Sequence, residues 1–222
     1  FTAGNGYAVA IASALGVKCH EFSHQDGHIM AGIYSVGAYD LLDEPFISVH
    51  LSGGTTEILK SEYNGYNFDN EIIGGTLDIS AGQLIDRTGV NMGLKFPRGK
   101  QLEKLAFSVD ETFSLPVSVK GAYVNLSGIE TKLQTITGFS DAVIARSVLF
   151  YIAEILKTTI RNAINETGIK KILVAGGVAS NSIIRTKLID EFSDNIYFAS
   201  KELSSDNAVG TAVLAYKAEE KK

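Results

Sequence analysis

The 222-residue sequence lacks the features of disulfide-linked, membrane-spanning and strongly basic proteins. Its single cysteine, Cys19, excludes a framework of disulfide bonds and fits a reducing compartment such as the cytoplasm. No apolar run reaches the roughly 18 residues of a membrane-spanning helix. With 20 Lys and Arg against 25 Asp and Glu, the net charge of −5 argues against a free-standing basic nucleic-acid binder. We therefore expect a cytoplasmic protein without a membrane contact.

Apolar residues, 45% of the chain, follow strand and helix patterns. Alternating residues predict an antiparallel meander of strands at 46–51, 55–60 and 66–73. Helices are predicted at 7–15, 24–34, 77–88, 141–167 (capped by Asp141), 180–192 and 204–218 (capped by Ser204 or Ser205), and buried strands at 171–175 and 196–198. This order predicts an α/β fold, a mixed sheet with a β-meander and helices on both faces. One lobe of the actin-like ATPase and sugar kinase folds has this arrangement.

Two histidines four residues apart, His24 and His28, fall on one face of the second predicted helix. Imidazoles at this spacing are close enough to share one metal ion. Zinc-protease helices have the same spacing, but the residue after the first histidine is Gln25 here, so their general base is missing. Two surface histidines on a helix are the alternative explanation.

Glycine-containing turns follow two of the predicted strands. Ser52-Gly53-Gly54-Thr55-Thr56 follows the first strand of the meander, and Gly176-Gly177 precedes Asn181 after the strand at 171–175. Backbone amides in such turns bind phosphate groups, and an asparagine there can bond a base or a ribose. A plain glycine hairpin and helix capping are the alternatives. Asp78 and Asp206 lie at predicted helix starts, where capping is the common role and metal ligation a second role for Asp206.

Seven motifs occur in a fixed order along the chain, and the set is more specific than any member. They are HQDGH, LSGGTT, GGTLDISAGQLID, PRG-x-x-x-E, NLSGIETKL, AGGVASN and SSDNAVGTA. In this order the motifs resemble the TsaD (Gcp) family of tRNA adenosine threonylcarbamoyltransferases, earlier described as O-sialoglycoprotein endopeptidases. The resemblance covers essentially the whole chain.

The resemblance implies a set of site residues. It assigns a divalent metal, iron or zinc, to His24, His28 and Asp206, and we add His50 as a ligand because it lies two residues before Ser52 on a strand. An outward-pointing strand histidine is the alternative for His50. The implied contacts to the nucleotide and the transferred group are Ser52, Gly53, Gly54, Thr55, Thr56, Asp86, Gly99, Glu103, Gly176, Gly177 and Asn181. Among these, Asp86, Gly99 and Glu103 are expected on the ribose side, and Asn181 at the adenine.

The family's reaction moves a threonylcarbamoyl group from its adenylate to the exocyclic amine of an anticodon-loop adenosine in tRNA. The implied cofactors are one divalent metal and an adenylate or ATP-type nucleotide, and no side-chain nucleophile is needed. The implied partners are tRNA and other proteins of the threonylcarbamoyladenosine pathway, including a related actin-like paralogue. Two alternatives stay open: a non-catalytic paralogue that binds a nucleotide or a partner, and a metal-dependent glycoprotease.

Several residues depart from the family's pattern. Arg98 replaces a glycine, Glu130 and Val9 replace lysines, and Thr55 replaces a histidine. A charge reversal at Glu130 weakens anion binding if the substrate lies within a Debye length of about 8 Å. These departures indicate either a divergent enzyme or a paralogue that has kept the fold and lost the transfer activity, and Glu130 and Val9 favour the non-catalytic alternative. The basic residues Lys95, Arg98, Lys100 and Lys104 are either a tRNA-facing patch or a solvated loop.

The predicted elements divide into two lobes. We expect residues 1–45 to be the remnant of a first actin-like lobe that carries the histidine helix. Residues 46–222 are expected to form the second lobe, with a helical insertion at about residues 92–140 and the C-terminal helix at 204–218. Because a helix is predicted almost at the start, we expect the family's N-terminal segment to be missing.

Overall fold

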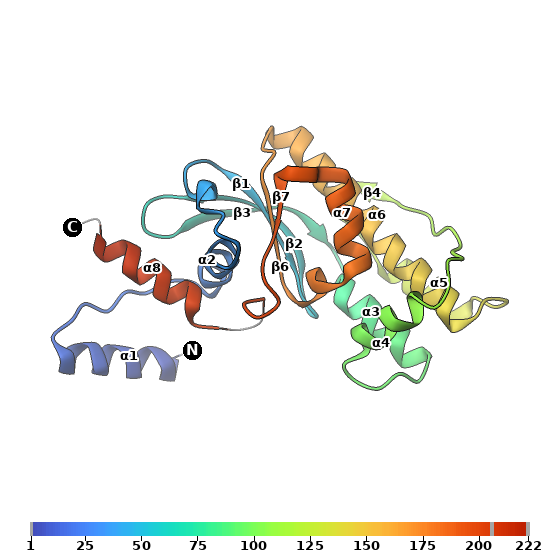
Figure 1. The fold of residues 1–222 in the computed structure, drawn as a ribbon, viewed down its shortest axis with the longest axis horizontal. Coiled ribbons are helices and arrows are strands. Elements are labelled where there is room, and N and C mark those ends of the chain that lie inside the picture. The colour runs from blue at the N-terminus through green and yellow to red at the C-terminus, as the bar shows by residue number, and fades with distance from the viewer. Residues whose placement is uncertain (1, 205–206, 221–222) are drawn as a thin grey trace.

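The computed structural model describes residues 2–204 and 207–220, which contain a seven-stranded mixed sheet with helices packed against it (Figure 1). The strand order is β4-β5-β3-β2-β1-β6-β7. The strands are β1 (Phe46–Leu51), β2 (Thr56–Tyr63), β3 (Phe68–Thr76), β4 (Val119–Lys120), β5 (Tyr123–Val124), β6 (Ile172–Ala175) and β7 (Ile196–Phe198). The first three form the antiparallel meander, and β6 pairs in parallel with β1 and β7. The predicted mixed sheet with a meander is therefore confirmed.

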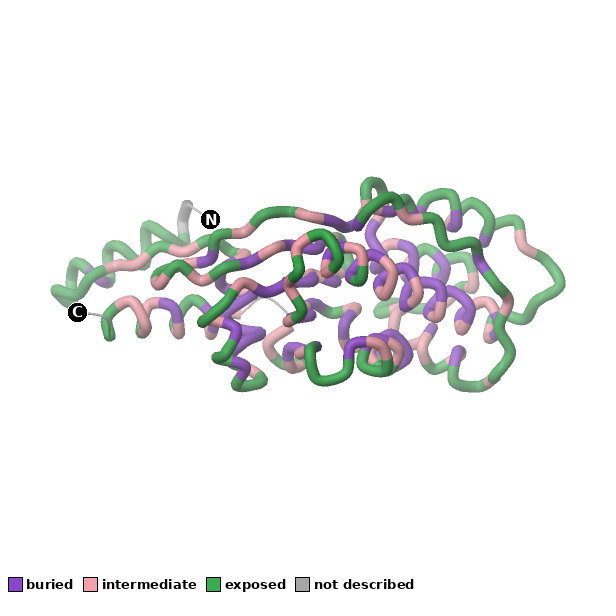
Figure 2. The backbone as a smooth tube through the Cα atoms, turned by 90° about the horizontal axis from the view of Figure 1, so that it is seen from above, coloured by how far each residue is buried: buried purple, intermediate pink, exposed green. Residues whose placement is uncertain are grey.

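Helices cover both faces of the sheet. They are α1 (Thr2–Leu15), α2 (His24–Val36), α3 (Ala81–Asn91), α4 (Arg98–Ala106), α5 (Ser127–Thr135), α6 (Asp141–Thr167), α7 (Ser182–Phe192) and α8 (Val209–Glu220). The larger apolar core joins the sheet to α3, α4, α6 and α7, and a smaller one joins it to α2 and α8. Figure 2 shows the buried residues concentrated between these layers, whereas the N-terminal segment is mostly exposed.

Alternation along β1 decides which side chains face which core. Ile47, Val49 and Leu51 belong to the larger core, and Phe46 belongs to the smaller core beside α2. Because successive strand residues point to opposite faces, His50 lies on the α2 side of the sheet. The strand pattern thus directs an imidazole toward the histidine helix.

Some predicted boundaries are wrong at helix starts. Helix α3 begins at Ala81 rather than 77, because β3 extends to Thr76 and Ser80 forms a capping box with Gln83. Helix α8 runs from Val209 to Glu220 rather than over 204–218. The predicted cap Ser204 instead donates its hydroxyl to the Ser200 carbonyl, and Ser205 lies outside the described residues.

Capping also differs at α5 and α6. Ser140, not Asp141, caps α6 by accepting a hydrogen bond from the Val143 amide. Asp78 lies before α3 and not in its first turn, and its carboxylate accepts hydrogen bonds from the Leu126 and Ser127 amides at the start of α5. Burial raises the pKa of Asp78, but hydrogen bonds from Ser127, Leu126 and Ile79 outweigh this and hold it below its ordinary value.

The segment after α3 is mostly irregular around two short helices, α4 and α5. It supplies one side of the larger apolar core. The division into lobes at residue 45 stays a prediction. Among the described residues, no helix combines the length and apolarity that a membrane crossing requires.

Candidate functional site

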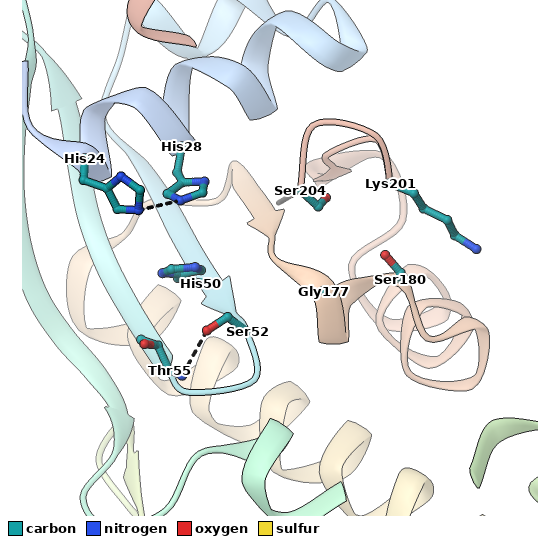
Figure 3. A pocket seen from close by; sticks show the side chains of 9 residues that line it. All are labelled: His24, His28, His50, Ser52, Thr55, Gly177, Ser180, Lys201 and Ser204. Atoms are coloured by element: carbon teal, nitrogen blue, oxygen red, sulfur yellow. Dashed lines mark hydrogen bonds between the residues drawn. The ribbon is translucent and has the colours of Figure 1, made fainter. Parts of the chain in front are cut away.

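A cleft of about 490 Å³ opens where β1 and β6 end side by side. Its lining comes from α2, from the ends of the two strands and from the segment before α8 (Figure 3). The lining residues are His24, His28, His50, Ser52, Thr55, Gly177, Ser180, Lys201 and Ser204. Parallel strands that end together place their following loops at one edge of the sheet, which is a common ligand position in α/β folds.

The start of α2 is fixed by its sequence. Ser23 and Asp26 form a capping box, so the helix begins at His24. The buried Asp26 carboxylate also accepts hydrogen bonds from the Phe68 amide and the Asn70 side chain of β3. This acidic residue inside the HQDGH motif therefore attaches the histidine helix to the meander, a role that sequence reasoning missed.

Three imidazoles gather at one end of the cleft. The Nε2 atoms of His24 and His28 are 3.0 Å apart, and the ring centroids of His28 and His50 are 5.5 Å apart (Figure 3). In the structure this contact is a hydrogen bond between the two imidazoles. Two nitrogen ligands about 2.1 Å from one tetrahedral ion are separated by about 3.4 Å, so the His24–His28 pair is close to, but tighter than, the spacing of two ligands of one ion. Among the described residues, no group of three or more His, Cys, Asp or Glu side chains is arranged to hold a metal ion. The predicted ligand Asp206 lies outside the described residues.

The two ends of the Ser52–Thr56 turn differ in their hydrogen bonds and in their burial. The Ser52 hydroxyl accepts hydrogen bonds from the Gly54 and Thr55 amides, which are the groups expected to bind phosphate. Thr56 is buried, and its hydroxyl accepts a hydrogen bond from the Ala81 amide of α3. Only Ser52 and Thr55 of this turn line the cleft.

A glycine outside the predicted set lets the turn approach α3. A Cβ atom on Gly82 would lie 2.4 Å from the Ser52 carbonyl oxygen. The turn is also held by a hydrogen bond from the Ser80 hydroxyl to the Gly53 carbonyl. The GGTLDISAGQLID motif therefore holds the turn in place. In the sequence, the signal for this role was Gly82, a small residue within a predicted helix.

The two glycines of the second turn, Gly176 and Gly177, differ in how closely they are packed. Gly176 has φ of 107°, and a Cβ atom there would lie 2.2 Å from the Leu51 carbonyl oxygen. Gly177 lines the cleft and has no neighbour within 4 Å of such an atom. Asn181 is buried and caps α7 by accepting a hydrogen bond from the Ile184 amide, as the capping alternative expects.

The predicted ribose-side residues lie on α3 and α4 and do not line the cleft. The Asp86 carboxylate pairs with Arg98 at 2.9 Å. The Glu103 carboxylate accepts hydrogen bonds from the amide and hydroxyl of Ser182 at the start of α7. A Cβ atom added to Gly99 would lie 3.7 Å from Cγ2 of Ile85, an ordinary contact distance. The side chains of Asp86 and Glu103 therefore bond other parts of the chain.

Two departures from the family's pattern have partners on neighbouring residues of α3. Arg98 pairs with Asp86, and Glu130 pairs with Arg87 at 2.8 Å. The side chain of Arg98 also packs against Gly89, where a Cβ atom would lie 2.8 Å away. The charge that Arg98 adds and the charge that Glu130 reverses are therefore each paired with an opposite charge in the fold.

Sequence reasoning missed Lys201, Ser180 and Ser204 in the cleft lining. Figure 3 shows the three on the side opposite the imidazoles. Lys201 lies three residues before the predicted cap Ser204, in an irregular segment that no periodicity marks. Figure 3 shows the Lys201 side chain extending away from the imidazoles, so the residue borders the cleft on its far side.

Two solved structures share the fold of this chain. HypF from T. kodakarensis matches with a TM-score of 0.66 and 18% identity over 97% of this chain and 39% of that one. The (R)-2-hydroxyglutaryl-CoA dehydratase component A of Acidaminococcus fermentans matches with a TM-score of 0.55 and 18% identity, covering 93% and 73%. The expected actin-like fold is confirmed.

The particular family follows from sequence comparison. A model of the TsaD family, tRNA N6-adenosine threonylcarbamoyltransferase, matches residues 2–213, and the chain belongs to this family. Two relatives with that description are 34% identical over 85% of this chain in Borreliella afzelii and 32% identical over 90% in Neorickettsia sennetsu. The chain spans 58% and 62% of their respective lengths. The comparisons favour neither the non-catalytic nor the glycoprotease alternative.

Proposed function

We propose that this chain provides the cleft in which a threonylcarbamoyl group passes from its adenylate to an adenosine of tRNA. The observation that carries the proposal is the convergence of His24, His28 and His50 on a cleft lined by Ser52 and Gly177, in a chain of the TsaD family. The reaction forms a bond between the adenosine N6 and the carbamoyl carbon. It breaks the bond from that carbon to the phosphate oxygen, so that AMP leaves and one N6 proton passes to solvent.

The imidazoles and Asp206 are the proposed holders of a divalent metal, iron or zinc. When bound, such an ion would polarise the mixed anhydride as a Lewis acid. The imidazoles from α2 and β1 would fix the position of the ion, because α2 is tied to β3 through Asp26. The metal set remains a proposal that includes a residue outside the described part of the chain.

The chain's own residues would position the adenylate and exclude water. Lys201 and Ser180 would contact the phosphate side opposite the imidazoles. Asp86 would reach the ribose only by exchanging its partner Arg98. The contacts of Gly53, Gly54, Thr56, Gly99, Glu103, Gly176 and Asn181 with the substrate stay predictions.

The other implied properties are proposals of the same kind. We infer a cytoplasmic enzyme that works with tRNA, with pathway proteins that make the adenylate, and with a related actin-like paralogue. The two-lobe division at residue 45 is likewise proposed. Each rests on membership of the family rather than on a contact in the structure.

Reconstitution tests the activity. The chain is mixed with threonine, bicarbonate, ATP, tRNA and the family's adenylate-forming and partner enzymes, and digested tRNA is examined by mass spectrometry. Threonylcarbamoyladenosine formation that is lost in His28→Ala would support the proposal. Absence of product, where a full-length relative succeeds with the same components, would refute it.

A further inference from the structure

Helices α2 and α8 lie side by side (Figure 1) and meet at a pair of buried glycines, Gly27 and Gly210. A Cβ atom added to Gly210 would lie 1.9 Å from the Gly27 carbonyl oxygen and 2.6 Å from the Ala31 amide nitrogen. Both distances are far below an ordinary van der Waals contact, which begins at 3.4 Å. The two backbones are therefore in direct contact, and only glycine at position 210 allows it.

The Gly27–Gly210 contact lies inside the histidine motif, because Gly27 directly precedes His28. Each residue of an α-helix turns by about 100° around the axis, so Gly27 lies about 60° from His24 and about 100° from His28. The first turn of α8 therefore packs against the side of α2 that adjoins its imidazole face.

Helix α2 also holds the other end of the segment that leads into α8. The Ser200 amide donates a hydrogen bond to the Ser35 hydroxyl near the end of α2, and Lys201 and Ser204 border the cleft. The chain then enters α8, whose first turn contacts Gly27. Ser35 and Gly27 are eight residues apart, which is about 12 Å along a helix. One helix thus carries two imidazoles and fixes both ends of the segment that faces them.

We infer that Gly210 is a positioning residue of the cleft, because its contact with Gly27 sets how far Ser204 and Lys201 lie from the imidazoles. The inference rests on the proposed function, since it treats the cleft as the adenylate site. A larger residue at position 210 would separate α8 from α2 without removing any side chain that lines the cleft. If the contact only stabilised the fold, ligand affinity would follow stability from variant to variant.

The first test measures AMP affinity by calorimetry. In Gly210→Ala the added carbon must move from 1.9 Å to at least 3.4 Å from the Gly27 oxygen, so α8 must shift. AMP should bind at least about tenfold more weakly, because a misplacement of about 1 Å can cost about 100-fold in a site that depends on geometry. Gly6→Ala is the matched control, since an added Cβ atom at this helical glycine meets nothing within 4 Å and should leave the affinity unchanged.

The second test separates position from stability. Leu214 of α8 is fully buried in the smaller core beside α2, so Leu214→Ala removes apolar packing and leaves the glycine contact in place. Its midpoint in urea should fall at least as far as that of Gly210→Ala, while its AMP affinity stays that of the unmodified chain. Equal losses of AMP affinity in the two variants would reduce the contact to a stabilising one and overturn the inference.

The third test restores the approach of the helices from the other side. A Cβ atom on Gly27 would lie 2.9 Å from the Thr211 hydroxyl oxygen, the end of a side chain that can be removed. Gly27→Ala should therefore weaken AMP binding less than Gly210→Ala, and Gly27→Ala/Thr211→Ala should recover the original affinity. This pair decides the matter if Gly210→Ala does not fold, and failure of the second substitution to restore binding would overturn the inference.

The transfer assay judges the proposed function separately. Product formation together with equal AMP affinity in Gly210→Ala and the unmodified chain would overturn the positioning role and leave the function standing. The expected order of AMP affinities without any product would support the positioning role while refuting the function. An unmodified chain that binds no AMP would overturn the inference, because the cleft would then not be a nucleotide site.

Discussion

The residues that the family resemblance assigns to one site fall into two regions of different character. On the cleft side, His24, His28 and His50 converge, and Ser52 shares the cleft with Gly177. On the α3–α4–α7 side, Asp86 and Glu103 bond other parts of the chain. The difference teaches that one family motif set supplies both the lining of the cleft and contacts that hold the fold together. Changes on the cleft side should mainly alter binding, and changes on the other side should mainly alter stability.

The largest expected effect is on the stability of variants at the glycine pair Gly176 and Gly177. It tests whether the first glycine supports the packing of the backbone while the second only lines the cleft. Gly176→Ala should lower the free energy of unfolding by about 3 kcal/mol, because the new methyl group meets the Leu51 carbonyl and φ is positive. Gly177→Ala should stay within about 0.5 kcal/mol. Urea denaturation of both variants provides the measurement. Equal stabilities would mean that the two ends of β1 and β6 are not packed as described.

The next effect concerns metal affinity on the cleft side. His28→Ala should weaken Zn²⁺ binding by at least about 100-fold, measured by calorimetry, since it removes a proposed ligand. His20→Ala is the matched control. The His20 imidazole bonds Glu219 and Tyr66 away from the cleft, so its loss should leave affinity unchanged. Similar affinities in the two variants would separate the histidine helix from metal binding.

Much of the fold was predictable because local pattern determines it. The bounds of β1, β7 and α6 agree with the predictions, since alternation, short apolar runs and a long helical stripe each have one interpretation. Helix starts were less predictable, because Ser, Asp and Asn compete for capping. Over 204–207, the sequence offers four such residues, and the described Asn207 side chain accepts a hydrogen bond from the Val209 amide.

The site was predictable in its residue types but not in its partners. Alternation placed His50 on one face of β1, while only the folded chain shows that α2 covers that face. Asp78 was expected to favour its own helix, but it caps α5, which is 48 residues further on. No local pattern reports a pair at such separation. The Arg98–Asp86 pair likewise depends on how α4 packs against α3.

A smaller effect tests whether Glu103 mainly supports α7. Glu103→Ala should lower the free energy of unfolding by about 1 kcal/mol, because α7 loses a carboxylate at its first amide. Adenosine affinity should change less than about threefold, because the free energy of one exposed polar contact is no larger than that. Glu111→Ala, an exposed carboxylate far from α7 in sequence, controls for charge. A large loss of adenosine affinity with unchanged stability would move Glu103 to the ligand side of the comparison.

The smallest expected effect asks whether Asp86 can pass from assembly to binding. Arg98→Ala removes its partner, and because an exposed ion pair is worth 0.2–1 kcal/mol, AMP affinity should rise by about threefold. The gain should disappear with a 2′,3′-dideoxy analogue, because the freed carboxylate would accept from the ribose hydroxyls. Arg87→Ala breaks the adjacent pair with Glu130 and should not change AMP affinity. Equal AMP affinity of the unmodified chain, Arg98→Ala and Arg87→Ala would mean that Asp86 only stabilises the fold. The residues that contact the ribose would then have to lie on the cleft wall itself.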